Sequence, residues 1–285
     1  MNCTRLYRLV LLVAIAHLSL VTGALCQESI FPDKALESAV RKEVFAKRYN
    51  EEPITKEDVK NISQVHGKGL GIKSLAGLEH CLAVQEIDLE DNEIVDLAPM
   101  AGLKLLLSIN LAGNQIESVE PLKELDRVQY LDLSRNKIKD ISPLAKMTNM
   151  RSLYLSENRI EDISVVKHMP KIWTLYLAGN PVQDFAPISQ LKWLSSLDLS
   201  HCKLSDLEFL RPLTELKYVN LRNNEIADLS VLVEMAEQDT DRRFAPFWRI
   251  YLEGNPLDGE KVQQQIARLK ELGARISLDD GKDAS

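Results

Sequence analysis

The chain repeats itself with a period of 22 residues, and this period constrains its fold more than any other feature. The stretch Val128–Asn149, VQYLDLSRNKIKDISPLAKMTN, carries apolar side chains at fixed steps around Asn136. The same frame returns 22 residues earlier and 22 residues later. A unit of this length has an apolar edge that it cannot bury alone, so neighbouring units must stack. The period therefore predicts an elongated stack of similar units.

Each unit follows the frame L-x-x-L-x-L-x-x-N, which is the leucine-rich repeat pattern. An asparagine amide both donates and accepts hydrogen bonds, so it suits the bend where the chain leaves a strand. The residues that we expect at this ladder position are Asn92, Asn114, Asn136, Asn158, Asn180, Cys202, Asn224 and Asn255. Cys202 offers only a weaker thiol donor. The side chains two, five, eight and eleven places further on are apolar from the first unit through the unit of Asn224, and we expect them to point inward.

The sequence therefore predicts an α/β solenoid, a leucine-rich repeat horseshoe with a parallel β-sheet on its concave face and short helical turns on its convex face. Nine units fill residues 62–257, the last starting at Phe247 after an insertion at 236–246. The first and last units of a stack expose apolar surface, which capping segments must bury. Residues 27–61 are predicted to form a helical cap, with Asp33 and Thr55 at the helix starts. Residues 258–285 are predicted to form a second cap helix and a tail.

The first 26 residues differ from the rest and read as a signal peptide. Two arginines precede a 13-residue apolar run, Leu9–Val21, and small residues follow it. The run is too short to span a bilayer comfortably, which takes about 20 residues. We therefore expect a secreted, periplasmic or cell-envelope protein with no membrane span after signal removal. A lipid anchor at Cys26 is the alternative, but Leu25 stands where such signals usually place a small residue.

The composition argues against several functions. A net charge of −7 and the lack of a Lys/Arg run exclude a basic face for nucleic acid. Five histidines share no ligand spacing, and no phosphate-binding loop is present, so we expect no metal, no cofactor and no enzyme activity. Cys81 and Cys202 lie more than five units apart, on the order of 25 Å at ~4.8 Å per strand, so we expect two free, buried thiols.

The residues that flank the core leucines should face solvent along the concave sheet. Five of the seven tyrosines of the chain fall there, and Tyr and Trp are favoured at binding hot spots. The candidate partner-binding residues are Tyr130, Tyr154, Tyr176, Trp173, Asp132, Asp198, Tyr218, Arg222, Arg249 and Tyr251. Tyrosine is also simply a good exposed strand residue. The insertion at 236–246, with Arg242 and Arg243, is either a second recognition loop or a tolerated insertion.

Four stretches support a resemblance to a known family. PLAKMTNMRSLYLSENRIEDIS is similar to the 22-residue repeats of internalins, a repeat type shared with the leucine-rich regulatory subunit of protein phosphatase 1. IFPDKALESAVRKEV, PITKEDVKNI and GIKSLAGLEH resemble the helical cap and first repeat of internalin-like secreted bacterial proteins. The resemblance covers about residues 30–257. It implies an extracytoplasmic, non-enzymatic protein whose concave face binds a protein or glycan.

Two other interpretations stay open at this stage. An intracellular regulatory scaffold of the phosphatase-subunit type would fit the repeats if the N-terminal segment does not direct export. A purely architectural role in the cell envelope is the other. We expect a monomer in each case.

Overall fold

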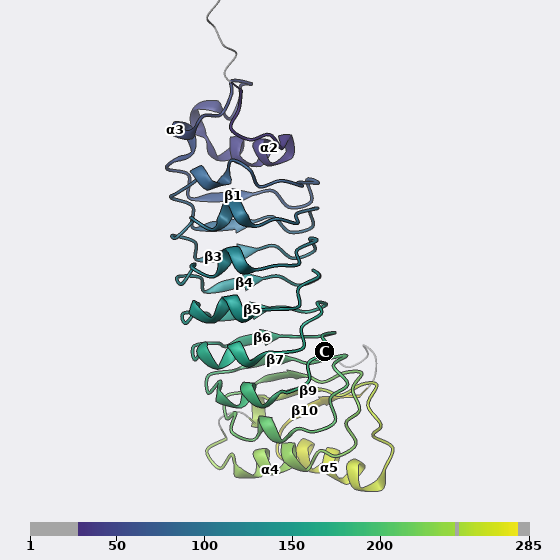
Figure 1. The fold of residues 1–285 in the computed structure, drawn as a ribbon. Helices are drawn as coiled ribbons and strands as arrows, with labels where there is room; N and C mark the ends of the chain where they lie inside the picture. The colour runs from purple at the N-terminus through teal and green to yellow at the C-terminus, as the bar shows by residue number, and fades with distance from the viewer. Residues whose placement is uncertain (1–27, 243–244, 279–285) are drawn as a thin grey trace, which may run out of the picture.

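The computed structural model describes residues 28–242 and 245–278. The proposed signal segment, Arg243 and most of the tail lie outside these residues. The described chain forms one elongated ladder, with α2 and α3 at one end and α4 and α5 at the other (Figure 1). The predicted leucine-rich repeat solenoid is confirmed.

One open sheet runs the length of the ladder, and its strand order follows the sequence order from β1 to β10. All neighbouring strands are parallel, and residues 22 apart pair in register from β1 to β8, as Tyr130 does with Ser152. The strands are β1 (Gln64–His66), β2 (Glu86–Asp88), β3 (Ser108–Asn110), β4 (Tyr130–Asp132), β5 (Ser152–Tyr154), β6 (Thr174–Tyr176), β7 (Ser196–Asp198), β8 (Tyr218–Asn220), β9 (Arg249–Tyr251) and β10 (Arg275–Ser277).

Short 3-10 turns lie opposite the strands, on the convex side. They are η2 (Leu78–His80), η3 (Ala98–Met100), η4 (Glu120–Leu122), η5 (Ser142–Lys146), η6 (Ser164–His168), η7 (Ala186–Gln190) and η8 (Glu208–Leu210). An aspartate or serine side chain just before most of these turns accepts a hydrogen bond from a backbone N–H of the turn. The Asp140 carboxylate accepts from the Ser142 N–H at 2.8 Å, and the Asp162 carboxylate accepts from the Ser164 N–H. These side chains satisfy backbone donors that a short helix leaves unpaired.

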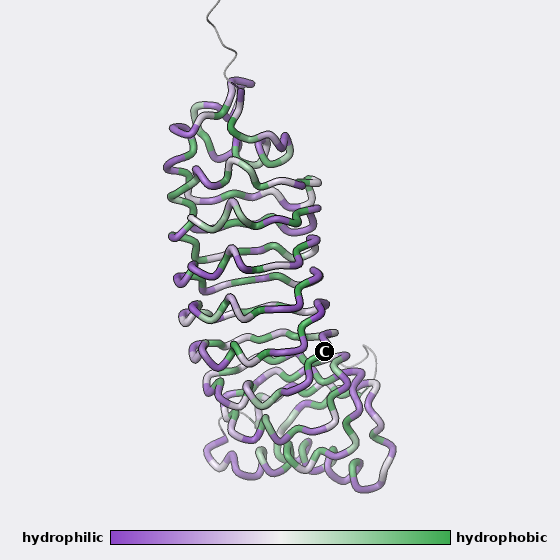
Figure 2. Tube along the Cα trace, viewed as in Figure 1, coloured by the Kyte–Doolittle hydropathy of each residue, from purple (hydrophilic) through white to green (hydrophobic). Residues whose placement is uncertain are grey.

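The core is a continuous column of buried apolar side chains between the sheet and the turns. Hydrophobic residues accordingly recur along the whole length of the ladder (Figure 2). Nearly all the apolar positions expected to point inward are buried. Phe185 is the exception, because it is only partly buried. Cys81 and Cys202 are free and buried, as expected.

Two caps cover the ends of this column. The N-terminal cap holds α2 (Lys34–Glu43), η1 (Phe45–Lys47) and α3 (Lys56–Val59). The Asp33 carboxylate accepts from the first-turn N–H groups of α2 and from the N–H groups of Lys73 and Ser74, so it joins the cap to the first repeat. The Asp58 carboxylate accepts from the N–H and hydroxyl of Thr55, which completes the expected capping box.

The C-terminal end departs from the regular repeat. The stretch after β8 forms α4 (Ser230–Gln238), which packs on α5 (Glu260–Glu271), and β10 adds a strand beyond the nine units. Phe247, which was expected to start the ninth unit, is 62% exposed, and its neighbour Trp248 is fully buried instead. The 3-10 turn η9 (Ala245–Phe247) precedes β9, so the chain enters this strand along a different path from the earlier units.

Candidate functional site

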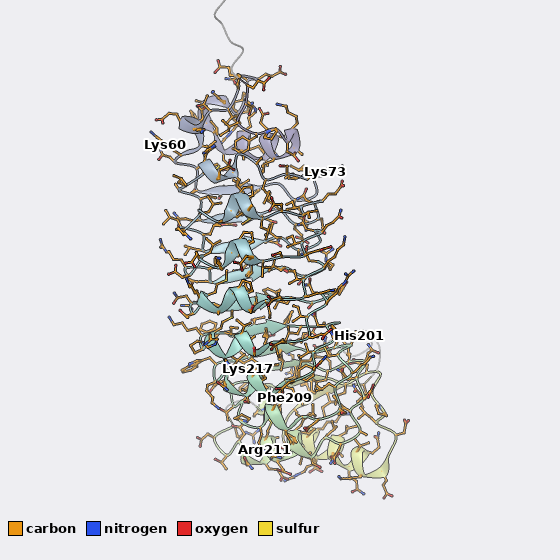
Figure 3. The ribbon with its side chains drawn as sticks, viewed as in Figure 1. Lys60, Lys73, His201, Phe209, Arg211 and Lys217 are labelled. Atoms are coloured by element: carbon orange, nitrogen blue, oxygen red, sulfur yellow. The ribbon has the colours of Figure 1, made fainter. Side chains whose placement is uncertain are left out.

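Lys73 and His201 lie along one edge of the stack in Figure 3, and His201 directly precedes the ladder residue Cys202. Asn136 shows the pattern. Its Nδ2 donates to the carbonyls of Leu111 and Leu133, each at 3.0 Å, and its Oδ1 accepts from the Ile116 N–H at 3.0 Å. One side chain thus bridges its own unit and the preceding one.

Every other ladder asparagine makes the same bonds. In each case the side-chain amide donates to a carbonyl of the preceding unit and accepts from an N–H group of that unit. These asparagines are Asn92, Asn114, Asn158, Asn180, Asn224 and Asn255. At Cys202 the thiol sulfur lies 3.5 Å from the Leu177 carbonyl and 3.4 Å from that of Ser200. Burial raises the pKa of this thiol to about 11. These residues hold the stack and leave the concave face to other side chains.

Five tyrosines on the concave face form one continuous row of ring contacts, which we call the tyrosine ridge. Its members, in order, are Tyr130, Tyr154, Tyr176, Tyr218 and Tyr251. The centroid distances between successive rings are 5.4, 5.0, 6.3 and 5.1 Å, within the range of favourable aromatic pairs. The ridge extends from β4 to β9.

The ridge crosses β7, which has no aromatic residue. That strand presents Ser196 and Asp198 to the concave face, and the rings of Tyr176 and Tyr218 approach over it in a stacked arrangement. The Tyr176 hydroxyl lies 3.0 Å from Ser196 Oγ, which anchors the ring above the gap. Small side chains on β7 therefore keep the row unbroken.

The phenols of the ridge are half-buried. Burial, followed by the nearby carboxylate of Asp132, raises the pKa of Tyr130 to about 12. Burial, followed by the carboxylate of Asp198, raises the pKa of Tyr218 to about 12. These hydroxyls are neutral at physiological pH and can donate hydrogen bonds.

Three of the charged candidates have internal partners. Asp132 accepts from the Ser134 N–H at 2.9 Å, and burial raises the pKa of its carboxyl. Asp198 accepts from the Ser200 N–H at 2.9 Å and from Asn220 Nδ2 at 2.9 Å. Both carboxylates stabilise the bend after a strand. The repeat alignment of the sequence does not reveal this role.

Arg222 is held in the same way. Its guanidinium pairs with both carboxylate oxygens of Glu253, at 2.7 and 2.9 Å, and lies 4.5 Å from the ring centroid of Tyr251. Glu253 is buried and also accepts from the Ser277 hydroxyl. Arg222 therefore fixes the last ring of the ridge.

Trp173 and Arg249 remain exposed. Trp173 precedes β6 and lies under the Arg151 guanidinium at 5.4 Å, and no ring contact among the described residues joins it to the ridge. The structure thus brings the five tyrosines and Arg222 into one surface and places Trp173 apart from that row.

Comparisons with known proteins agree with this geometry. A family model described as leucine-rich repeats (2 copies) matches residues 126–168, 174–212 and 194–234. The structure of an internalin C2 from Listeria monocytogenes superposes with a TM-score of 0.69 at 32% identity, and the match covers 72% of this chain and 91% of that one. The chain belongs to the internalin-like leucine-rich repeat family.

Two other solved structures also match this internalin-like chain. A second Listeria monocytogenes internalin covers 90% of it, with a TM-score of 0.77 and 25% identity, and 72% of that protein is matched. A leucine-rich repeat protein of Leptospira interrogans, 20% identical with a TM-score of 0.61, shares the fold over 70% of the present chain and 56% of its own. A search among curated proteins finds no match.

Leucine-rich repeat proteins of the internalin type are protein-binding modules. No helix within residues 28–242 and 245–278 is long and apolar enough to cross a membrane. Over the same residues, no group of three or more His, Cys, Asp or Glu side chains is arranged to hold a metal ion.

Proposed function

We propose that this internalin-like chain is an exported, non-enzymatic protein that binds a protein partner through its concave face, with the tyrosine ridge as the main contact. The observation that carries the proposal is the unbroken row of ring contacts from Tyr130 to Tyr251. The solenoid holds this row on a rigid, extended surface of the kind that repeat proteins use for recognition.

Preorganisation favours the ridge as a hot spot. Each ring is half-buried against its neighbours, so much of its rotational freedom is already lost before a partner binds. Tyrosine then offers a large contact area and a hydroxyl at low entropic cost. Trp173, 53% exposed beside β6, would extend the contact to the rim.

The charges along the concave face suggest the polarity of the partner. Glu86 is exposed on β2, whereas Arg249 and Arg275 are exposed on β9 and β10. A protein that presents basic groups towards β2 and acidic groups towards β10 would complement this face. Its association should slow as salt rises, because rim charges mainly steer encounter. A glycan stacked on the rings would lack this salt dependence.

The export part of the proposal rests on Met1–Cys26, whose order of basic, apolar and small residues is that of a secretory signal. Sequencing the N-terminus of the protein from its native cell tests it. A mature chain that begins at or close to Gln27 is expected. A lipid-modified N-terminal Cys26 would indicate an anchored form, and a chain that retains Met1 in the cytosol would favour the intracellular scaffold.

The binding claim is tested by replacing Tyr154 and Tyr176 together with Ala and measuring capture of partners. The matched control is Tyr49→Ala, because Tyr49 is 92% exposed in the N-terminal cap, away from the sheet. We expect the double variant to lose the capture that the control keeps, with both variants folded by circular dichroism. Equal capture by a folded double variant would remove the ridge from the binding surface.

A further inference from the structure

At one interface of the described stack, the side-chain hydrogen bond that a ladder asparagine accepts at the other interfaces is absent. In the regular pattern, the ladder side chain accepts from the N–H of the residue two places after the preceding ladder position. This bond is present at Ile72, Ile94, Ile116, Ile138, Ile160, Leu204 and Ile226. Val182 is the corresponding residue where Cys202 replaces asparagine, and across the described chain no hydrogen bond joins its N–H to the next unit.

The neighbouring backbone bond is missing as well. In the regular units the backbone N–H of the residue after the ladder position donates to a carbonyl of the preceding unit. Lys137 N–H, for example, donates to the Ile116 carbonyl at 2.9 Å. No such bond joins Lys203 to Val182 within the described repeats. Pro181 has no N–H, and the Gln183 N–H donates to the Glu161 carbonyl at 3.1 Å instead. The loop after Asn180 is therefore tied to the unit before it and not to the unit after it.

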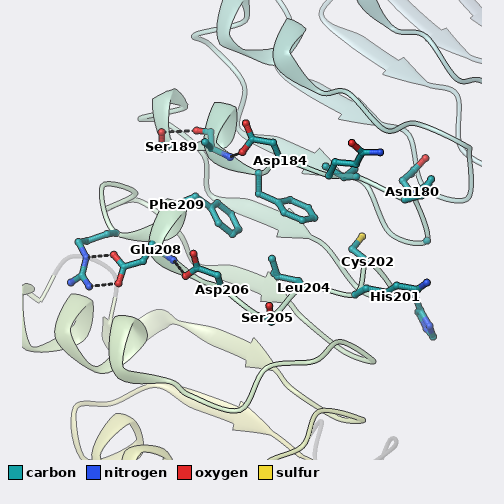
Figure 4. A pocket seen from close by; sticks show the side chains of 18 of the residues that line it. Asn180, Asp184, Ser189, His201, Cys202, Leu204, Ser205, Asp206, Glu208 and Phe209 are labelled. Carbon is teal, nitrogen blue, oxygen red and sulfur yellow. Dashed lines mark hydrogen bonds and ion pairs between the residues drawn. The ribbon is translucent and has the colours of Figure 1, made fainter.

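The two units are separated at this interface by a crevice of about 990 Å³ (Figure 4). One wall is apolar, because the rings of Phe185 and Phe209 stack with centroids 5.5 Å apart and planes inclined by 25°. Val182, Cys202 and Leu204 continue the lining. The volume is that of a small-molecule site. Polar and charged residues, among them Gln183, Lys203 and Arg211, line the rest of the crevice.

We propose that this crevice binds a small, neutral, planar aromatic carboxamide. Val182 lines the crevice, and within the described chain neither its N–H nor its carbonyl has a hydrogen bond to the next unit, so an amide would supply the matching acceptor and donor. Asparagine provides the same acceptor at every other interface, so the ligand amide takes the place of the missing side chain. The aromatic part lies against Phe185 and Phe209.

The charged groups near the rings favour a neutral ligand over a carboxylate. Asp184 and Asp206 both line the crevice (Figure 4). Each carboxylate already accepts from a backbone N–H of the following turn, at 2.8 and 2.9 Å. Their negative charge remains and repels an anionic aromatic acid.

Benzamide is a direct probe, titrated into the full chain by calorimetry beside benzoate and toluene, which lack the neutral amide. We expect saturable benzamide binding and at least tenfold weaker binding of both analogues. Phe209→Ala should weaken benzamide binding at least tenfold, whereas Phe45→Ala, which removes an 85% exposed ring in the N-terminal cap, should not change it. Toluene that binds as tightly as benzamide, or a wild-type chain without saturable benzamide binding, would overturn the proposal.

Cys202→Asn tests the origin of the crevice. The new amide can accept from the Val182 N–H, as its counterparts do, so this variant should be more stable in urea and should no longer bind benzamide. A Cys202→Asn chain that folds and binds benzamide like the wild type would overturn the account. The Tyr154→Ala and Tyr176→Ala variants leave the crevice intact and should bind benzamide normally, so this test does not depend on the concave-face proposal.

Discussion

The rings of Tyr154 and Tyr176 meet edge to face, with centroids 5.0 Å apart and planes inclined by 86°. They come from the same column of neighbouring strands, and the register of β5 with β6 places one directly beside the other. This pair is the centre of the tyrosine ridge. The repeat that lets the units stack therefore also sets the spacing of the side chains on the concave face.

Asn136→Ala should destabilise the stack by about 2–4 kcal/mol, because two carbonyls and one buried N–H lose a partner. Urea unfolding measures the effect. Asn149→Ala is the matched control, because Asn149 is less buried and makes no bond to the core of the stack. A loss below 1 kcal/mol for Asn136→Ala would mean that water replaces the amide, against the structural role assigned to it here.

Arg222→Ala should cost about 3 kcal/mol at neutral pH, because it leaves the buried Glu253 carboxylate without its cation. Burial acts to raise the pKa of Glu253, but hydrogen bonds from Arg222 and Ser277 lower it below its usual value. The pair therefore stabilises the fold above the pKa of the unfolded carboxyl, and this contribution is lost as the pH falls through the folded pKa. The difference between wild type and variant should shrink in acid.

Arg211→Ala serves as the control for that variant. Its guanidinium pairs with Glu208 and Glu234, but both carboxylates are largely exposed. Exposed ion pairs contribute little, so urea midpoints should barely change. An equal loss in both arginine variants would show that burial of Glu253 is not what makes Arg222 important.

The phenols of Tyr130 and Tyr218 in the ridge should ionise at a higher pH than an exposed tyrosine. Because the pKa values of Tyr130 and Tyr218 are raised to about 12, their phenols stay neutral well above the usual value of 10. The folded state then holds protons that the unfolded chain has lost, so stability should fall as the pH rises from about 10 towards 12. Ultraviolet titration should show phenolate formation delayed in the wild type, and Tyr130→Phe should remove one late phenolate. Simultaneous ionisation of all tyrosines near pH 10 would contradict the packed ridge.

Cys81 and Cys202 should be inert in the native protein. Burial raises the pKa of Cys81 to about 12 and that of Cys202 to about 11, so few thiolates form near neutrality. Iodoacetamide should label neither residue until urea unfolds the chain. Rapid native labelling at Cys202 alone would show that the neighbouring crevice opens further than the structure indicates.

The periodic part of the fold could be predicted from the sequence because each residue type recurs in the same surroundings. Asn136 and its counterparts, and the strands before them, follow directly from the period. Phe247 could not be placed correctly, since its neighbour Trp248 becomes the inward residue only after η9 redirects the chain. Such a path depends on how α4 packs on α5, which no local pattern specifies.

The sequence could predict which residues of the candidate site face the concave side, but not which side chains contact one another. The alternation of strand residues placed the tyrosines on the concave face, yet the ring contact across β7 depends on side-chain rotamers and on the small residues there. The roles of Asp132, Asp198 and Arg222 needed the positions of Ser134, Asn220 and Glu253. The inter-unit crevice did leave a signal, because Cys202 departs from the ladder asparagine and Pro181 follows the asparagine before it.

Site-specific photocrosslinking tests the central claim most directly. A benzophenone amino acid in place of Tyr176 would sit in the ridge, and the same amino acid in place of Tyr49 would sit in the N-terminal cap. Irradiation in the presence of the native cell surface or its extracts should yield a discrete protein adduct from position 176 and none from position 49. A folded chain that forms its adduct from position 49 and not from position 176 would contradict recognition through the concave face.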